Sequence, residues 1–313
     1  NEIKENILIL LETYFSQMST YCSEHYFESW IPNIAALRYL KTIGKLTKEF
    51  QTKIESCLST GYQQLLGLRK DSFSLWDGKN NSSVWFTAYL VKLLLHAKDF
   101  VPVNNRYIEE GFDFIKSQQL LDGDFANQTH EFDKMEKRLH SGVPLVAFVA
   151  IAFQENVDNK TVYKDLVDKC LNYLSLKTAA DMDDNFAIAI SAYALALGGR
   201  HEAEKFIEVL KSNVIRSDEQ WYWHREKNKL ATADSLSISV EIAAYAIMAF
   251  VKSGKSTEAL PIVKWLIAQR NSVGGFYSTT GTVVGWQALA MIATEFYSEE
   301  INMNLTINYE NNK

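Results

Sequence analysis

Two kinds of helical pattern alternate along this chain. One kind is apolar around its whole circumference, with small residues beside an aromatic residue or a leucine, as in residues 187–195 (AIAISAYAL). The other is amphipathic, with apolar residues at i, i+3, i+4 and i+7 and charges opposite, as in residues 107–115 and 203–210. A helix without a polar face must be covered on every side, so the pattern predicts buried helices alternating with surface helices.

The apolar pattern recurs six times. Its central alanines, spaced 44 to 59 residues apart, are Ala36, Ala88, Ala147, Ala192, Ala244 and Ala288. A unit of this length holds two helices and two turns, so six units predict twelve helices. We therefore expect an all-α fold, an α/α toroid with six inner and six outer helices (an α6/α6 barrel).

Turn and strand signals refine this picture. Two predicted outer helices lead into a glycine followed by an aromatic residue, at residues 118–125 and 269–277. The glycine is expected to end the helix and the aromatic ring to fill the space between hairpins. Residues 301–309 alternate apolar and polar residues as a strand does. We expect a toroid domain over residues 1–300 and the start of a following β domain, or a tail, over residues 301–313.

Composition excludes several classes of protein. The 313 residues are 47% hydrophobic and 22% charged, which is typical of a folded chain, and no linker-like tract divides them. A net charge of −6 without a basic stripe disfavours nucleic-acid binding. No apolar run reaches the roughly 18 residues of a membrane span. The first residues resemble the middle of a helix rather than a signal peptide, so we expect a domain of a longer protein.

Cysteines and glycosylation signals bear on the compartment. The three cysteines, Cys22, Cys57 and Cys170, leave at least one thiol unpaired within the chain, and their disulfide state stays open. Cys57 and Cys170 lie in amphipathic segments without a histidine at ligand spacing, so no zinc site, and no other metal or cofactor, is expected. Five Asn-x-Ser/Thr sequons favour a secreted glycoprotein: Asn80, Asn81, Asn127, Asn159 and Asn304.

An acidic run offers a rival function. Asp181, Asp183 and Asp184 have the Asp-x-Asp-Asp form that class II terpene cyclases, which also fold as α/α toroids, use as a proton donor. The run directly precedes the inner helix near Phe186, where acidic residues cap a helix and favour its dipole. We interpret it as a cap, with an enzyme or a weak Ca²⁺ site as alternatives. The aromatic residues 221–226 (WYWHRE) are expected to fill space between hairpins rather than form an exposed interface.

Several stretches together resemble the thioester domain of the α2-macroglobulin and complement superfamily. The resemblance covers nearly the whole chain and is closest to the insect thioester-containing proteins, including their macroglobulin complement-related branch. The stretches that carry it are residues 85–92 (WFTAYLVK), 122–125 (DGDF), 187–195, 239–246 (SVEIAAYA) and 263–280. The resemblance implies the α/α toroid that the repeats predict.

The family motif Gly-Cys-Gly-Glu-Gln, followed by Pro-Asn, falls on a degenerate segment. Its five positions are Tyr21, Cys22, Ser23, Glu24 and His25, with Pro32 and Asn33 in register. In the family, the cysteine sulfur attacks the glutamine carboxamide and ammonia leaves, which forms an internal thioester. The imidazole of His25 has no acyl carbon, and Glu24 lies at the wrong spacing. We therefore expect no thioester, and a relic thiol at Cys22 rather than a reactive Cys22–His25 pair.

A second family position supports the same expectation. Fast-reacting members carry a histidine shortly after the Asp-Gly-x-Phe turn, and that position falls on Asp133, while His130 comes three residues earlier. The resemblance thus implies a non-catalytic, thioester-deficient, complement-like domain of a secreted protein. It would recognise proteins or cell and pathogen surfaces non-covalently, in innate immunity or cell contact, beside macroglobulin and CUB-type domains. The alternatives are a covalent opsonin with an unusual bond and a toroid enzyme using the Asp181–Asp184 run.

Overall fold

A computed structural model of the chain describes residues 30–42, 44–67, 83–126, 139, 141–155, 162–225, 233–271 and 275–301. Within these ranges the protein is almost entirely helical, as the sequence predicts, and the all-α class is confirmed. The boundary expected near residue 300 is not tested, because the last described helix ends at Ile301 and residues 302–313 lie outside the described part.

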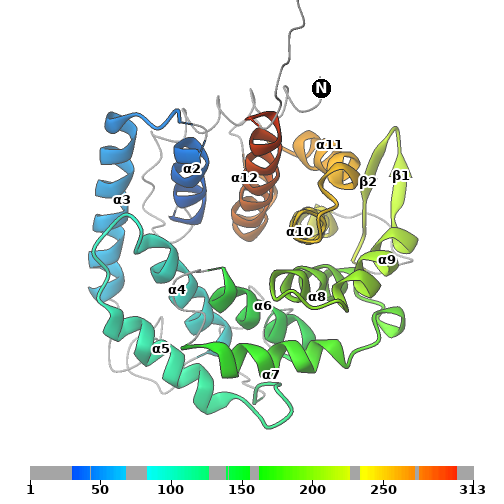
Figure 1. Cartoon of the computed structure of the whole chain (residues 1–313), viewed down its shortest axis with the longest axis horizontal. Coiled ribbons are helices and arrows are strands. Elements are labelled where there is room, and N and C mark those ends of the chain that lie inside the picture. The colour runs from blue at the N-terminus through cyan, green and yellow to red at the C-terminus, as the bar shows by residue number, and fades with distance from the viewer. Residues whose placement is uncertain are drawn as a thin grey trace, which may run out of the picture.

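Six helices form an inner ring. They are α2 (Trp30–Thr42), α4 (Val84–Ala97), α6 (Gly142–Gln154), α8 (Asn185–Leu197), α10 (Ala233–Lys252) and α12 (Thr279–Ile301). Each contacts the next in this order, and α12 returns to contact α2, so the ring is closed (Figure 1). Helix α6 contains no charged residue, and its residues from Leu145 to Gln154 are all buried. The apolar pattern in the sequence thus marks the inner ring.

Five further helices in the described part of the chain surround this ring, and all but the largely apolar α11 are amphipathic. They are α3 (Lys48–Gly67), α5 (Asn105–Gln118), α7 (Lys164–Ser175), α9 (Ala203–Asn213) and α11 (Leu260–Ala268), with the 3₁₀ turns η3 (Ala179–Asp181) and η4 (Ser256–Ala259). Figure 1 shows them outside the inner helices. The expected sixth outer helix has no counterpart among the described residues. The expected pairing of an inner helix with an outer one holds for the other five.

The predicted turn at residues 118–125 is present, but the prediction that its glycine ends the helix is wrong, because the cap of α5 is the extended residue Gln119. Helix α5 ends at Gln118, and Gly123 takes φ +94°, a left-handed conformation that favours glycine. A Cβ atom on Gly123 would lie 2.4 Å from the Lys169 carbonyl oxygen, so this turn packs directly against the backbone of α7. The ring of Phe125 is buried at the end of the turn. Phe276, in the second predicted turn, is buried as well.

A short hairpin forms the one two-stranded sheet among the described residues, which otherwise have a single β-bridge between Gln119 and Phe125. Strands β1 (Ile215–Ser217) and β2 (Gln220–Tyr222) pair antiparallel through a turn in which Asp218 and Glu219 have positive φ. The hairpin directs the next residue, Trp223, into the core, where its indole Nε1 donates to the Leu210 carbonyl at 2.8 Å. Tyr222 stacks on Trp265 of α11, with ring centroids 5.3 Å apart. This aromatic stretch therefore fills space between helices, as expected.

Candidate functional site

The degenerate thioester segment lies outside the described residues. This holds for Tyr21 to His25, for Asp133, and for all five sequons. The helix that follows the motif is described, and it starts at Trp30, whose indole packs against Gly61 of α3. Family position Asn33 is buried in α2. The thioester segment, the Asp133 position and the sequons therefore remain predictions from the sequence.

The acidic run before α8 caps that helix. The Asp184 carboxylate accepts from the Phe186 backbone N–H at 2.9 Å, and it also accepts two hydrogen bonds from the Arg225 guanidinium, at 3.0 and 2.9 Å. Asp181 and Asp183 are exposed. A proton-donating site would need these carboxyl groups together in a closed apolar pocket, so the arrangement supports the cap.

The two described cysteines are not positioned for metal binding. Cys57 is disulfide-bonded, whereas Cys170 is a free, fully buried thiol in α7. Burial raises the pKa of the Cys170 thiol, although the Gln119 amide, 3.3 Å from Sγ, opposes that shift. No cluster of three or more candidate metal ligands occurs within the described ranges. The same ranges contain no helix that meets the length and hydropathy of a membrane span.

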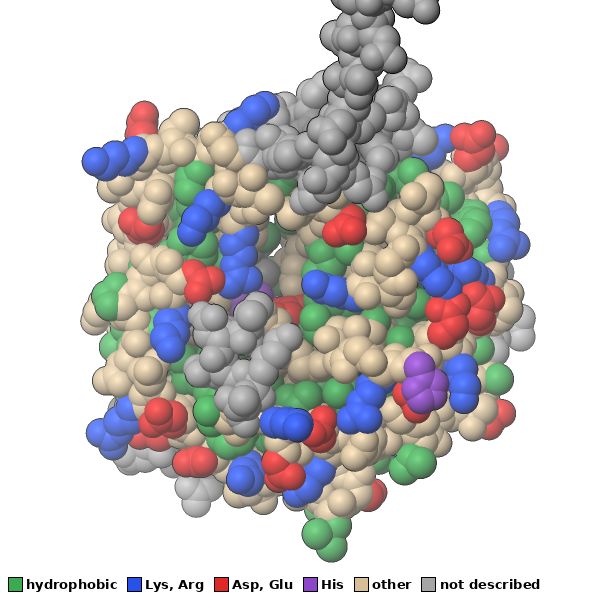
Figure 2. All heavy atoms as spheres, in the orientation of Figure 1, with side chains coloured by type: hydrophobic (Ala, Val, Ile, Leu, Met, Phe, Trp, Pro, Cys, Tyr) green, Lys and Arg blue, Asp and Glu red, His purple; other side chains and the backbone are tan. Residues whose placement is uncertain are grey.

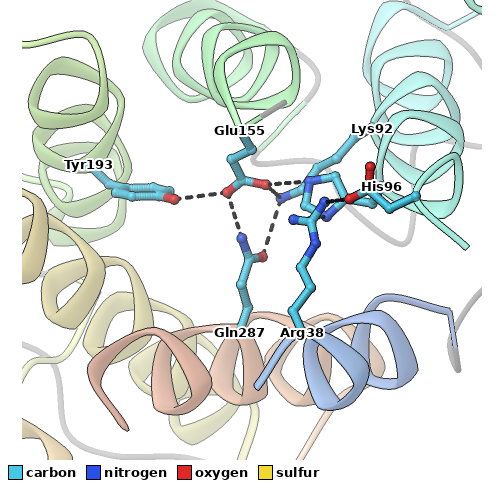
Figure 3. A network of polar contacts seen from close by, with 7 residues as sticks. Arg38, Lys92, His96, Glu155, Tyr193 and Gln287 are labelled. Carbon is cyan, nitrogen blue, oxygen red and sulfur yellow. Dashed lines mark hydrogen bonds and ion pairs between the residues drawn. The ribbon is translucent and has the colours of Figure 1, made fainter. Parts of the chain in front are cut away.

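The most concentrated polar chemistry in the described structure lies inside the inner ring (Figure 3). Glu155, directly after the last residue of α6, is its centre. One carboxylate oxygen, Oε1, accepts from the Tyr193 hydroxyl at 2.9 Å and from the Gln287 amide at 2.6 Å. The other, Oε2, lies 3.1 Å from both Lys92 Nζ and His96 Nε2. A single carboxylate thus connects α4, α6, α8 and α12.

This cluster is buried but electrically balanced. The Lys92 and Glu155 side chains are 4% and 5% exposed. Burial alone would raise the pKa of Glu155, yet the Lys92 ammonium and the contact with His96 together hold that pKa well below its usual range. The Lys92 ammonium also lies 3.4 Å from the Gln287 amide oxygen and over the Phe148 ring. Glu155 and Lys92 therefore form a buried pair of opposite charges, in which Glu155 Oε1 has two hydrogen-bond donors, whereas Oε2 and His96 Nε2 approach each other without hydrogen-bond geometry.

A second ion pair lies beside the first. Arg38 of α2 donates to Asp99 at 2.5 Å, and its other terminal nitrogen lies 3.5 Å from His96 Nδ1. Both side chains of this outer pair are partly exposed. Figure 2 shows that the face viewed is hollowed near its centre, with histidine and acidic side chains visible at depth. The cluster thus extends from a buried core at Glu155 to a partly exposed pair at Arg38 and Asp99.

Sequence reasoning did not identify this cluster. Its members come from helices that are far apart in the chain; Lys92 and Gln287 are 195 positions apart. One signal was present, because Lys92 is the only Asp, Glu, Lys or Arg in the apolar segment from Val84 to Ala97. A charge in a helix that is buried on every side needs a partner inside the protein.

Comparison with known proteins assigns the fold and the chain to one family. The family model "A-macroglobulin TED domain" matches residues 5–291. The chain therefore belongs to the TED (thioester) domain family of the macroglobulin and complement proteins. Relatives include thioester-containing protein 1 of Anopheles gambiae, 28% identical to allele R1 over 93% of this chain and 27% identical to allele S1 over 94%. The chain spans only 21% of the length of these relatives.

Proposed function

We propose that this chain is a thioester-deficient TED domain that acts by non-covalent recognition. The observation that carries the proposal is the replacement of the family's acyl-donating glutamine by His25, within a segment that keeps Cys22 and Glu24. Family membership makes the motif the expected site of chemistry. Without a carboxamide at that position, no side chain three residues from Cys22 can supply the acyl carbon of a thioester.

The biological setting is proposed from the relatives. Their printed name, thioester-containing protein, and the complement-type family suggest a secreted protein of innate immunity, or one that mediates contact between cells. The parent chain would carry macroglobulin and CUB-type domains beside this one. The domain would bind proteins or cell and pathogen surfaces non-covalently and perform no enzymatic step. Its five sequons would carry glycans facing the extracellular medium.

The test is the intact mass of the secreted, deglycosylated protein before and after methylamine treatment. Methylamine opens a thioester, adds its own mass and exposes a thiol. We expect no added mass, whatever the oxidation state of Cys22. Incorporation of methylamine at the segment from Tyr21 to His25 would overturn the proposal and indicate a covalent opsonin with an unusual bond. Non-reducing peptide mapping then locates any further thiol, with the free thiol of Cys170 as internal reference.

A restored variant makes a negative result interpretable. Tyr21→Gly, Ser23→Gly and His25→Gln together rebuild the family motif in this chain. If that variant gains methylamine and the wild type does not, the loss of the glutamine and the two glycines explains why the wild type forms no thioester. The contacts of Asp184, which caps α8 and binds Arg225, favour the cap over the enzyme alternative for the Asp181–Asp184 run.

A further inference from the structure

The seam between α2 and α4 contains a histidine held between opposite charges. On one side, His96 Nε2 lies 3.1 Å from the Glu155 carboxylate. On the other, Nδ1 lies 3.5 Å from the Arg38 guanidinium of α2, which can only donate. Nδ1 must therefore accept, and the ring proton belongs on Nε2, facing Glu155. The neutral imidazole with this tautomer turns its acceptor toward Arg38 and its N–H toward Glu155, although the contact with Glu155 lacks hydrogen-bond geometry.

Protonation at Nδ1 removes the acceptor that Arg38 uses. The imidazolium would then point an N–H at a guanidinium that carries only donors and a positive charge. The two groups would repel at a distance where they now attract. Arg38 has an alternative partner in Asp99, which it already contacts at 2.5 Å, and it is partly exposed, so it can turn away from His96.

The charged groups around His96 act in opposite directions, and Glu155 has a larger effect on its protonation than Arg38 has. Among the described residues, Glu155 from the end of α6 favours the imidazolium, while Arg38 from α2 and Lys92 from α4 itself disfavour it. The Glu155 carboxylate is already shared with Lys92, Tyr193 and Gln287. Burial is the largest influence and lowers the pKa of His96, and the two cations lower it further.

We propose that His96 and Arg38 form an acid-sensitive latch between α4 and α2, in which protonation of His96 breaks its contact with Arg38 and loosens α2 from the inner ring. Helix α2 is the element that would respond. Arg38 joins α2 to α4 through His96 and to Asp99, just beyond the end of α4, so the latch is one of two polar contacts that this side chain makes across the seam. Helix α2 also directly follows the segment that contains the degenerate thioester motif.

The sign of the pH effect follows from linkage. A buried histidine with a lowered pKa binds its proton more readily once α2 opens and water reaches the ring. The closed state is therefore favoured above the ordinary histidine pKa of about 6.5 and loses stability as the pH falls below it. We expect opening of α2 to increase across this window, before the protein unfolds as a whole.

Hydrogen exchange at the backbone amides of α2 tests the latch in the full 313-residue chain. After correction for intrinsic exchange rates, the amides of α2 should exchange several-fold faster at about pH 5.5 than at about pH 7.5, while those of α8 should not. The variant His96→Gln keeps a donor and an acceptor but cannot titrate in this range, so its α2 exchange should not depend on pH. His201→Gln removes an exposed imidazole and is the matched control.

A second measurement keeps the proposal testable if His96→Gln does not fold. The imidazole of His96 is titrated by NMR in the wild type and in Arg38→Gln. Removal of the guanidinium should raise the pKa of His96, whereas a merely structural role for Arg38 would leave it unchanged. Exchange in α2 that is indifferent to pH, an unchanged response in His96→Gln, or an unshifted His96 titration in Arg38→Gln would each overturn the latch.

Discussion

The Glu155 carboxylate lies 3.1 Å from the Lys92 ammonium, and both side chains are buried inside a ring of helices. Two opposite charges in such a place cost desolvation energy that only their mutual contact and the surrounding donors offset. Glu155 has those donors in Tyr193 and Gln287. The pair therefore specifies how four inner helices meet, rather than adding stability in proportion to its charge.

Breaking this pair on one side should be costly. Glu155→Gln leaves the Lys92 ammonium buried without a counter-charge, and we expect a loss of about 3–5 kcal/mol in the free energy of unfolding. Lys92→Met added to Glu155→Gln should recover part of the loss, because no charge then remains uncompensated. Urea unfolding of the two single variants and the double variant measures the coupling.

Glu110→Gln, in the exposed pair with Arg106, is the control and should cost no more than about 1 kcal/mol. Additive effects of the Glu155 and Lys92 substitutions would contradict this account.

The Asp184 carboxylate should behave as a helix cap. Asp184→Ala removes its hydrogen bond to the Phe186 N–H and its pairing with Arg225, and should lower the free energy of unfolding by about 1–2 kcal/mol. Asp183→Ala alters an exposed neighbour and should change it by less than about 0.5 kcal/mol. Thermal unfolding compares the two. Equal losses in the free energy of unfolding for the two variants would mean that the capping hydrogen bond of Asp184 does not stabilise the domain.

Gly123 should tolerate no side chain. In Gly123→Ala, the new Cβ meets the Lys169 carbonyl oxygen at 2.4 Å, in a backbone conformation that already disfavours alanine. Gly142→Ala shares the positive φ but meets nothing within 4 Å, so it isolates the conformational penalty of about 1–2 kcal/mol. Chemical denaturation should show a larger loss for Gly123→Ala. Similar losses would show that α7 can move away from the turn.

Cys170 should be unreactive while the domain is folded. Its thiol is fully buried and its pKa is raised by that burial, so little thiolate is present at neutral pH. Iodoacetamide should modify Cys170 only in denaturant, as peptide mapping without reductant would show. Modification under native conditions at a rate typical of an exposed cysteine would mean that α7 opens readily.

Periodicity in the sequence predicted much of this fold, because each inner helix must hide its whole circumference. The burial of Phe125 and the capping by Asp184 were also predictable, since both depend on neighbours only a few positions away. The Glu155 cluster was not, because periodicity says that a residue faces inward but not which distant helix it will meet. The hairpin before Trp223 was missed for a different reason: its turn uses Asp218 and Glu219, where glycine or asparagine would have been the usual signal.

The contact between α12 and α2 has a consequence for how the chain acquires its structure. These are the last and the first helices of the described ring, and they lie side by side (Figure 1). The face of each that packs on the other stays uncovered until both are present. During synthesis, α2 leaves the ribosome before the other helices of the described ring. Its partner α12 is available only after almost all of the remaining domain has been synthesised. Closure of the ring is therefore a late and strongly non-local step. Truncation anywhere before α12 should yield a soluble fragment only with the help of chaperones, since its open edge exposes apolar surface.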